Sequence, residues 1–361
     1  MRRALLLLGL GACGGEDQVP VDPAILLAPG PHPVGYRLTE VNYQPPLSST
    51  PRRLAVHVWY PATAKGEERP IYVVRKSEVA TVDAAPAELG PLPVVLYSHG
   101  HQAYATVMSQ VMEHWASHGY LVIAPTHSGN TFLDGDERQT DIYYLRPLDL
   151  SATLDHFQAL QGDPLAGRTS ERIAISGHSF GGYTAFALAG AQYPVDALDA
   201  GCAAGTTSSG YCSTLDPQNR ALFAAGFADP RFSAIVSFDP GDFGLFGSGG
   251  VAQIKSPVLQ VVAEGSGFAP GDPSGDPYWA ALHGDQDLHL LLRGGQHNDF
   301  TDSCGSGVSI RCSTLVPAEV IKPLAGYSLA FLERALRGRG DLTSILDATT
   351  PLSPLYQATR R

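Results

Sequence analysis

Residues 172–182 read RIAISGHSFGG, and residues 183–189 continue as YTAFALA. A short apolar run thus ends in the pattern G-x-S-x-G and passes into helix-forming residues. Gly177 and Gly181 leave room for a tight turn between a strand and a helix, which exposes Ser179 Oγ. The first N–H groups of such a helix point towards any negative charge that develops at the serine. The stretch predicts the nucleophile elbow of a serine hydrolase.

The rest of the chain alternates apolar runs with helical patterns. Two early runs, 34–43 and 54–60, predict antiparallel edge strands. Most later runs are unbroken and apolar, which is typical of parallel strands buried on both faces. No linker or repeat divides the pattern, so we predict one domain over residues 33–361 with the α/β-hydrolase fold, helices on both faces of the sheet, and the elbow on the fifth strand. Further strands are expected at 92–100, 119–125, 232–238, 257–263 and 288–293, and helices at 104–118, 148–160 and 318–336.

A histidine must activate the serine, because a hydroxyl is a weak nucleophile at neutral pH, and a carboxylate must fix the tautomer of that histidine. In this fold the chain order is serine, acid, histidine. His297 follows the last predicted parallel strand in a loop with two glycines, so it is the expected general base. His283 and His289 come before or within that strand and are poorer candidates.

The acid has three candidates. Asp239 directly follows the predicted strand 232–238, and Asp242 comes three residues later. Glu264 follows the next strand, but it lies too near the strand end to reach over the sheet. Ser266 occupies the position at which many α/β-hydrolases carry the aspartate. Asp239 is therefore favoured, with Glu264 and Asp242 as alternatives.

The end of the predicted strand 92–100 carries the turn SHGH at positions 98–101. An H-G turn at this point supplies a backbone N–H to an oxyanion hole, so the expected donors are the amides of His101 and Phe180. No H-E-x-x-H motif or matched carboxylate set accompanies the nearby histidines, so we predict loop-bracing or surface roles for them, no metal and no cofactor. These histidines are His99, His101, His114, His118 and His127.

Composition excludes several other classes of protein. Of the 361 residues, 44% are apolar, which is enough for the core of one large domain. The formal charge of −11, spread along the chain, leaves no basic stripe for nucleic acid. No stretch after residue 12 approaches the ~20 apolar residues of a membrane-spanning helix. The expected partner is a small-molecule or lipid ester substrate, and the expected state is a monomer.

The N-terminal residues have a different character. Arg2 and Arg3 precede an apolar run that ends in LGAC at positions 10–13. This pattern resembles the lipobox of bacterial lipoproteins. The resemblance implies a signal peptide over residues 1–12, a lipid on Cys13 and a flexible tether over 13–32. On this reading the protein is exported and anchored to a membrane, with its domain on the periplasmic or cell-surface side.

The other four cysteines form two close pairs in Gly- and Ser-rich sequence. Cys202 and Cys212 bracket nine residues, and Cys304 and Cys312 bracket seven. Neither pair has the C-x-x-C spacing of a zinc site. We therefore predict two local disulfides, Cys202 with Cys212 and Cys304 with Cys312, formed in an oxidising compartment.

Taken together, several segments resemble the platelet-activating-factor acetylhydrolase family and related dienelactone-hydrolase-like bacterial esterases. The resemblance runs from about residue 53 to residue 336. It implies Ca²⁺-independent hydrolysis of carboxylic esters, including short or oxidised sn-2 acyl chains of phospholipids. The matching segments are GHSFGG at 177–182, VLYSHG at 95–100, ASHGYLV at 116–122, the acid position Phe238-Asp239, and the H-x-x-F-x-D pattern of His297, Phe300 and Asp302.

Two loops depart from that family. Residues 194–231 form a long insertion, which is either a lid or an ordinary surface loop, and residues 304–312 form a second loop. Because the insertion has few large apolar residues, a preference for acyl groups from C2 to C6 is expected. The alternatives are a cutinase-like polyester hydrolase, a triglyceride lipase or, in a different class, a catalytically silent lipoprotein scaffold. The presence of Ser179, Asp239 and His297 argues against the scaffold.

Overall fold

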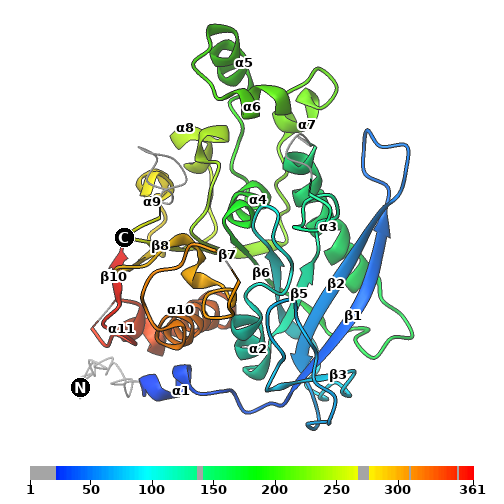
Figure 1. Cartoon of the computed structure of the whole chain (residues 1–361), viewed down its shortest axis with the longest axis vertical. Coiled ribbons are helices and arrows are strands. Elements are labelled where there is room, and N and C mark those ends of the chain that lie inside the picture. Colours follow the sequence, from blue (N-terminus) through cyan, green and yellow to red (C-terminus); the bar gives the residue numbers. More distant parts are fainter. Residues whose placement is uncertain (1–21, 136–140, 267–275, 309, 348) are drawn as a thin grey trace, which may run out of the picture.

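The computed structural model describes residues 22–135, 141–266, 276–308, 310–347 and 349–361. Within these residues ten strands form one sheet in the order β10-β9-β8-β7-β6-β4-β5-β2-β1-β3 (Figure 1). The strands are β1 (Val34–Tyr43), β2 (Arg52–Pro61), β3 (Ala80–Val82), β4 (Leu92–Ser98), β5 (Leu121–Pro125), β6 (Thr169–His178), β7 (Phe232–Phe238), β8 (Val258–Ala263), β9 (Leu288–Leu292) and β10 (Tyr356–Arg360).

The centre of the sheet is parallel and its edges are mainly antiparallel. The strands β9, β8, β7, β6, β4 and β5 all pair in parallel. β2 pairs antiparallel with both β5 and β1, as the sequence predicts for this edge. Every residue of β4, β5 and β8 is buried, which explains why these strands read as unbroken apolar runs.

Helices cover both faces of the sheet, in agreement with the predicted fold class. α2 and α10 pack on one face, and α3 and α4 pack on the other. The helices are α1 (Pro23–Leu27), α2 (Ser109–Ser117), α3 (Ile142–Ala159), α4 (Phe180–Leu188), α5 (Val195–Ala204), α6 (Ser209–Thr214), α7 (Arg220–Ala225), α8 (Gly247–Val251), α9 (Asp276–Ala281), α10 (Pro317–Arg337) and α11 (Thr343–Leu346), with 3-10 turns η1 (Phe243–Leu245), η2 (His297–Phe300) and η3 (Gly340–Leu342).

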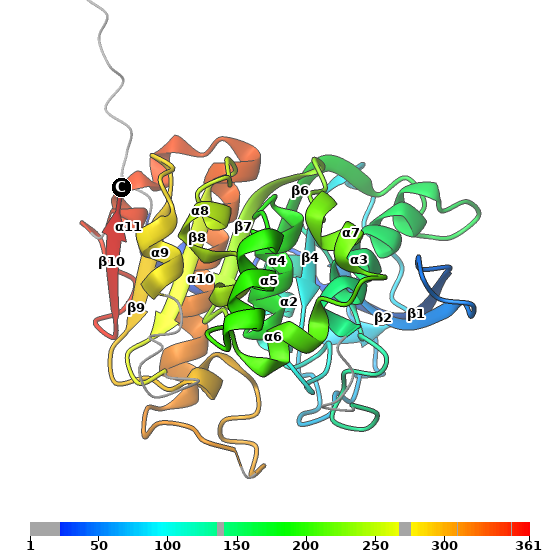
Figure 2. The same ribbon diagram turned by 90° about the horizontal axis from the view of Figure 1, so that it is seen from above.

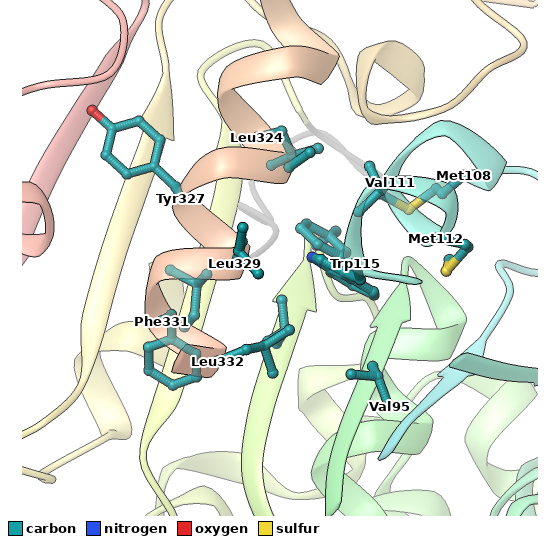
Figure 3. Packing of buried hydrophobic residues seen from close by; sticks show 14 of the residues in the cluster. Val95, Met108, Val111, Met112, Trp115, Leu324, Tyr327, Leu329, Phe331 and Leu332 are labelled. Carbon is teal, nitrogen blue, oxygen red and sulfur yellow. The ribbon is translucent and has the colours of Figure 1, made fainter. Parts of the chain in front are cut away.

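A cluster of large apolar side chains joins α2 to α10 on one face of the sheet (Figure 3). Trp115 of α2 is fully buried, and its indole N–H donates a hydrogen bond to Ser328 Oγ of α10 at 3.0 Å. Leu324 and Leu332 of α10 belong to the same cluster. Burial of each such leucine contributes about 1.5–3 kcal/mol to folding. The cluster therefore fixes α2, the helix that follows the SHGH turn.

Two short edge strands, β3 and β10, were not predicted from the sequence. β3 has three residues, too few to show a period. β10 pairs with β9 at the opposite edge, and only Tyr356 of its five residues is buried. An edge strand needs little apolar sequence, because one side of it meets no neighbouring strand. The extra β3 also makes the elbow strand the sixth along the chain rather than the predicted fifth.

The bounds of two predicted helices also differ from those observed. The helix expected from residue 104 begins at Ser109, and the helix expected from residue 148 begins at Ile142. The second difference arises at Pro147, which lies inside α3 although proline removes a helical hydrogen bond. The freed carbonyl of Tyr143 accepts a hydrogen bond from the Tyr183 hydroxyl at 2.9 Å. A tertiary contact thus replaces the missing helical bond.

The insertion at residues 194–231 contains the short helices α5, α6 and α7. α5 and α6 form the top of the molecule in Figure 1, and in the view from above they overlie α4 near its centre (Figure 2). The predicted disulfide between Cys202 and Cys212 is present and joins α5 to α6. The insertion thus lies on the side of the sheet that carries the elbow helix.

Candidate active site

Ser179 lies in a strained turn between β6 and α4. Its backbone angles are φ 58° and ψ −122°, a region that L-residues seldom occupy. A Cβ at Gly177 would collide with the Gly181 carbonyl, and a Cβ at Gly181 would collide with the Ser98 carbonyl. Only glycine therefore fits at either position. The strain of such a turn costs on the order of 1–3 kcal/mol and is typical of functional sites.

The structure brings His297 and Asp239 together. Asp239 directly follows β7 and its side chain is fully buried, whereas His297 begins the turn η2 after β9. The distance from His297 Nδ1 to Asp239 Oδ2 is 2.6 Å. A proton on Nδ1 donates to the carboxylate in this arrangement, which leaves the lone pair of Nε2 available for a base reaction. The His297 side chain is 20% exposed, so the ring edge remains accessible to a substrate.

Burial is the main cause of the pKa shifts at this pair. It lowers the pKa of His297, so the ring is neutral at neutral pH. It raises the pKa of Asp239, while Ser266 and the N–H of Ala263 oppose that change by favouring the charged carboxylate. Ser266 thus faces the acid from the position where the sequence analysis noted a missing aspartate.

The two alternative acids lie elsewhere. Glu264 accepts a hydrogen bond from the Gly294 N–H at 2.8 Å and pairs with Arg293 at the surface. Asp242 Oδ1 lies 3.1 Å from the Tyr143 hydroxyl and 3.3 Å from the Tyr211 hydroxyl. Only Asp239, of these three carboxylates, is placed against His297 by a described contact.

His178, inside the elbow itself, supports the histidine loop. Its ring stacks on His297 with centroids 4.4 Å apart, and its Nε2 lies 3.0 Å from the His297 carbonyl oxygen. It is nearly fully buried. No role was predicted for this residue, although it directly precedes Ser179 in the elbow and so lies close to the base of that serine.

Asp302, the last residue of the H-x-x-F-x-D pattern, anchors the histidine loop to α2. Its Oδ2 accepts a hydrogen bond from the Ser109 hydroxyl at 2.5 Å, and its Oδ1 accepts one from Gln110 Nε2 at 3.0 Å. Phe300 of the same pattern is fully buried and packs near Phe238. The pattern therefore holds in place the loop that begins with His297.

The two residues expected to supply oxyanion donors lie beside each other. A Cβ at Gly100 would lie 3.2 Å from Ser179 Cβ, so the SHGH turn passes directly against the serine. The rings of His101 and Phe180 meet edge to face with centroids 5.8 Å apart. The amides of these residues thus belong to the two segments that flank Ser179.

The other histidines of the sequence analysis brace the chain, as predicted. His99 Nε2 accepts a hydrogen bond from the His127 N–H at 3.0 Å, and both residues are fully buried. His114 Nε2 lies 3.0 Å from the Leu26 carbonyl, and His118 Nε2 lies 3.1 Å from the Ala28 carbonyl. The last two contacts hold the C-terminal end of α2 against α1 and the residue that follows it.

A surface cleft of about 660 Å³ lies between residues 27–34, α2 and α10. Arg75 and Glu113 line the cleft and form an ion pair with each other. Ser179, Asp239 and His297 are not part of its lining. The cleft is therefore separate from the candidate active site.

The second predicted disulfide, between Cys304 and Cys312, is also present. Two disulfides in one chain fit an oxidising, extracytoplasmic compartment. Among the described helices, none combines the length and the apolar character needed to cross a bilayer. Cys13 and the expected signal peptide lie outside the described residues.

Similar proteins are found over the middle of the chain. The Chlorophyllase family model matches residues 73–200. Chlorophyllase-2 of Arabidopsis thaliana is 32% identical over 180 residues, covering 49% of this chain and 43% of that protein. Chlorophyllase-1, chloroplastic, of Citrus unshiu is 30% identical over 187 residues, covering 46% of each chain. The chain thus spans less than half the length of these curated relatives. The family match includes the SHGH turn and Ser179 but ends before Asp239 and His297.

Among solved structures, a ferulic acid esterase from Streptomyces cinnamoneus superimposes with a TM-score of 0.66. The superposition covers 92% of this chain and 98% of the esterase, at 22% sequence identity. A structural match at this sequence identity supports the fold alone. With its mostly parallel sheet and the elbow between β6 and α4, the protein has the α/β-hydrolase fold that its sequence predicts.

Proposed function

We propose that this protein is a serine hydrolase of carboxylic esters that acts through an acyl-enzyme. The observation that carries the proposal is the strained Ser179 turn together with the 2.6 Å contact between His297 and Asp239. The names of the similar proteins, chlorophyllases and a ferulic acid esterase, support ester hydrolysis as the reaction class. Ser179, Asp239 and His297 follow one another in the chain order of this fold, which is serine, acid, histidine.

The proposed reaction has two halves. His297 Nε2 takes the Ser179 proton as Oγ attacks the ester carbonyl carbon, and the amides of His101 and Phe180 stabilise the resulting oxyanion. Collapse of this intermediate breaks the bond to the alcohol, which takes the proton from His297. Water then attacks the acyl-enzyme with His297 again as base, releasing the carboxylic acid and free Ser179.

For the substrate we propose short-acyl esters, including short or oxidised sn-2 chains of phospholipids. The insertion supports this preference, because its large apolar side chains pack into the core of the protein itself. Val195, Leu198 and Phe223 are buried there, and Phe227 packs against the Phe223 ring. They are thus not available to cover a long acyl chain. A C16 chain would present about fourteen methylenes, each worth ~0.8 kcal/mol if buried.

A series of p-nitrophenyl esters from acetyl to palmitoyl, run beside methyl ferulate and a short-acyl phospholipid, tests the substrate class. We expect kcat/KM to be highest from C2 to C6 and to fall beyond C8. Hydrolysis of none of these esters would contradict the proposed function. A profile that rises to C12 or C16, or that requires an oil interface, would favour the triglyceride lipase or polyester alternative.

Export and a lipid on Cys13 complete the proposal. The two disulfides support an extracytoplasmic location. The anchor itself rests on the resemblance of residues 10–13 to a lipobox. A lipid at this position would hold the enzyme at a membrane surface, where lipid esters are concentrated.

A further inference from the structure

A buried guanidinium lies beneath the SHGH turn. Arg146 of α3 has no exposed surface. Its Nη2 donates to the His99 carbonyl oxygen and lies 3.1 Å from Ser98 Oγ. Its Nη1 donates to Asn130 Oδ1 at 2.5 Å and reaches the Gly100 carbonyl oxygen at 3.4 Å. One side chain thus contacts two consecutive carbonyls of the turn that passes against Ser179.

The Gly100 carbonyl belongs to the same peptide unit as the His101 N–H. In a trans peptide these two groups point in opposite directions, and the structure contains no cis peptide bond among its described residues. Besides Arg146, this carbonyl meets His99 Nδ1 at 2.8 Å and the Ala103 N–H at 3.3 Å. Because the carbonyl is held by this cluster, the direction of the His101 N–H is fixed as well.

The same guanidinium also contacts the second donor residue. Arg146 Cζ lies 4.6 Å from the centroid of the Phe180 ring, which is a cation–π distance. Asn130 accepts a hydrogen bond from Arg146 through its Oδ1, and its Nδ2 lies 3.0 Å from His101 Nδ1. The contacts of Arg146 thus link the two segments whose amides flank Ser179.

A buried hydrogen-bond network continues from this turn. His127 Nε2 lies 2.9 Å from Ser98 Oγ, and His127 Nδ1 lies 2.8 Å from Asp149, which pairs with Arg52 at 2.6 Å. This network has the residue types of a catalytic triad, but Ser98 is fully buried and cannot contact a substrate. Burial lowers the pKa of Arg146 to about 9, so its charge persists at neutral pH. The network braces the SHGH turn, and Asp149 adds a negative charge near Arg146.

We propose that Arg146 is the positioning residue of the oxyanion hole, holding the Gly100–His101 peptide and the Phe180 ring so that both amides point at the same oxygen. This inference rests on the proposed function, because it assumes an oxyanion at Ser179. The two amides stabilise a negative charge that exists only in the transition state. Loss of Arg146 should therefore lower kcat and leave KM nearly unchanged.

The variant Arg146→Met tests the inference on the best p-nitrophenyl ester. We expect kcat to fall by about 10²–10³, the usual effect of losing one oxyanion donor, with KM within about threefold of the native value. Arg146→Lys should recover only part of the rate, because an ammonium lacks the planar fork that reaches both carbonyls. The inhibition constant of a trifluoromethyl ketone with the same acyl group, which forms an oxyanion on Ser179, should rise by the same factor.

Arg337 offers a matched control. Its guanidinium binds two consecutive carbonyls, those of His118 at 3.2 Å and Gly119 at 2.8 Å, and its Cζ lies 4.5 Å from the Tyr120 ring. That turn precedes β5, whereas the SHGH turn follows β4, so the two turns lie at opposite ends of parallel strands. Arg337→Met should lower the melting temperature but leave kcat and the ketone inhibition constant unchanged.

Asn130→Ala provides a second route if Arg146→Met does not fold. It removes the amide between Arg146 and His101 but leaves the guanidinium in place, and it should also lower kcat with little change in KM. An unchanged kcat in whichever of these variants folds, or a loss confined to KM, would overturn the inference. So would an equal loss of kcat in Arg337→Met.

Labelling of Ser179 by a fluorophosphonate separates this inference from the proposed function. In that reaction Oγ displaces fluoride from phosphorus, and the phosphoryl oxygen occupies the oxyanion hole. Slower labelling of Arg146→Met than of the native protein would support the positioning role of Arg146. If such labelling were found but no ester were hydrolysed, the result would contradict the proposed function alone. Ester hydrolysis that depends on Ser179 but not on Arg146 would contradict positioning alone.

Discussion

Ser179→Ala is expected to lower kcat for p-nitrophenyl ester hydrolysis by about 10⁶, the scale of loss seen when the nucleophile of a serine hydrolase is removed. The physical reason is that both halves of the proposed reaction require the acyl ester on Oγ, which forms in the first half and is hydrolysed in the second. Binding and the oxyanion donors remain, so a small residual rate over water should persist. Initial rates at saturating ester, with circular dichroism and a melting curve for each protein, provide the measurement.

Ser176→Ala is the matched control for this experiment. Ser176 lies three residues earlier on β6, is fully buried, and its hydroxyl has no hydrogen-bond partner in the described part of the chain. Its removal should change neither kcat nor the fluorophosphonate labelling. If Ser179→Ala kept a rate within tenfold of the native protein, the proposed mechanism would be wrong.

Asp239→Asn is expected to lower kcat by about 10⁴, because an amide in place of the carboxylate favours the wrong tautomer of His297. In the native protein the carboxylate accepts a hydrogen bond from the Nδ1–H, with 2.6 Å between Nδ1 and Oδ2, and leaves Nε2 as the base. An asparagine that turns its NH₂ towards Nδ1 would move the imidazole proton to Nε2. The hydroxyl of Ser179 would then lose its proton acceptor. Steady-state kinetics at pH 7 and 8 measure the loss.

Glu264→Gln serves as the comparison variant, since Glu264 is half exposed and contacts Arg293 and the Gly294 N–H. We expect a change in kcat of less than threefold, in line with surface substitutions that cost within ~0.5 kcal/mol. A large loss with Glu264→Gln and a mild one with Asp239→Asn would transfer the role of acid to the end of β8. Equal melting temperatures of the two variants would show that packing is not the cause.

Much of the candidate site could be predicted from local sequence. The elbow needs small residues at fixed positions around Ser179, and steric limits on the backbone make that requirement visible as G-x-S-x-G. His297 could be placed because a base must follow the last parallel strand. The two disulfides could be predicted because short loops close easily. Each of these features depends on residues close together in the chain.

Other parts of the site depend on contacts between distant segments. The sequence offered three acids, and the structure places Asp239, 58 residues from His297, within hydrogen-bond distance. Arg146 was not singled out from the sequence, because it lies before the helix expected at 148–160. Its partners lie 16 to 48 residues away, in the turn after β4 and the loop after β5.

The amino-acid sequence by itself determined the class of fold, the turn that carries Ser179 and the order of the chemical groups, because steric limits and hydrophobic periodicity act within short stretches. Only the tertiary structure decided which carboxylate meets the histidine, how Pro147 is tolerated in α3, and where the edge strand β10 pairs. These outcomes follow from the register of the parallel strands and from buried hydrogen bonds. Both join residues far apart in the chain, and neither leaves a periodic signal in the sequence.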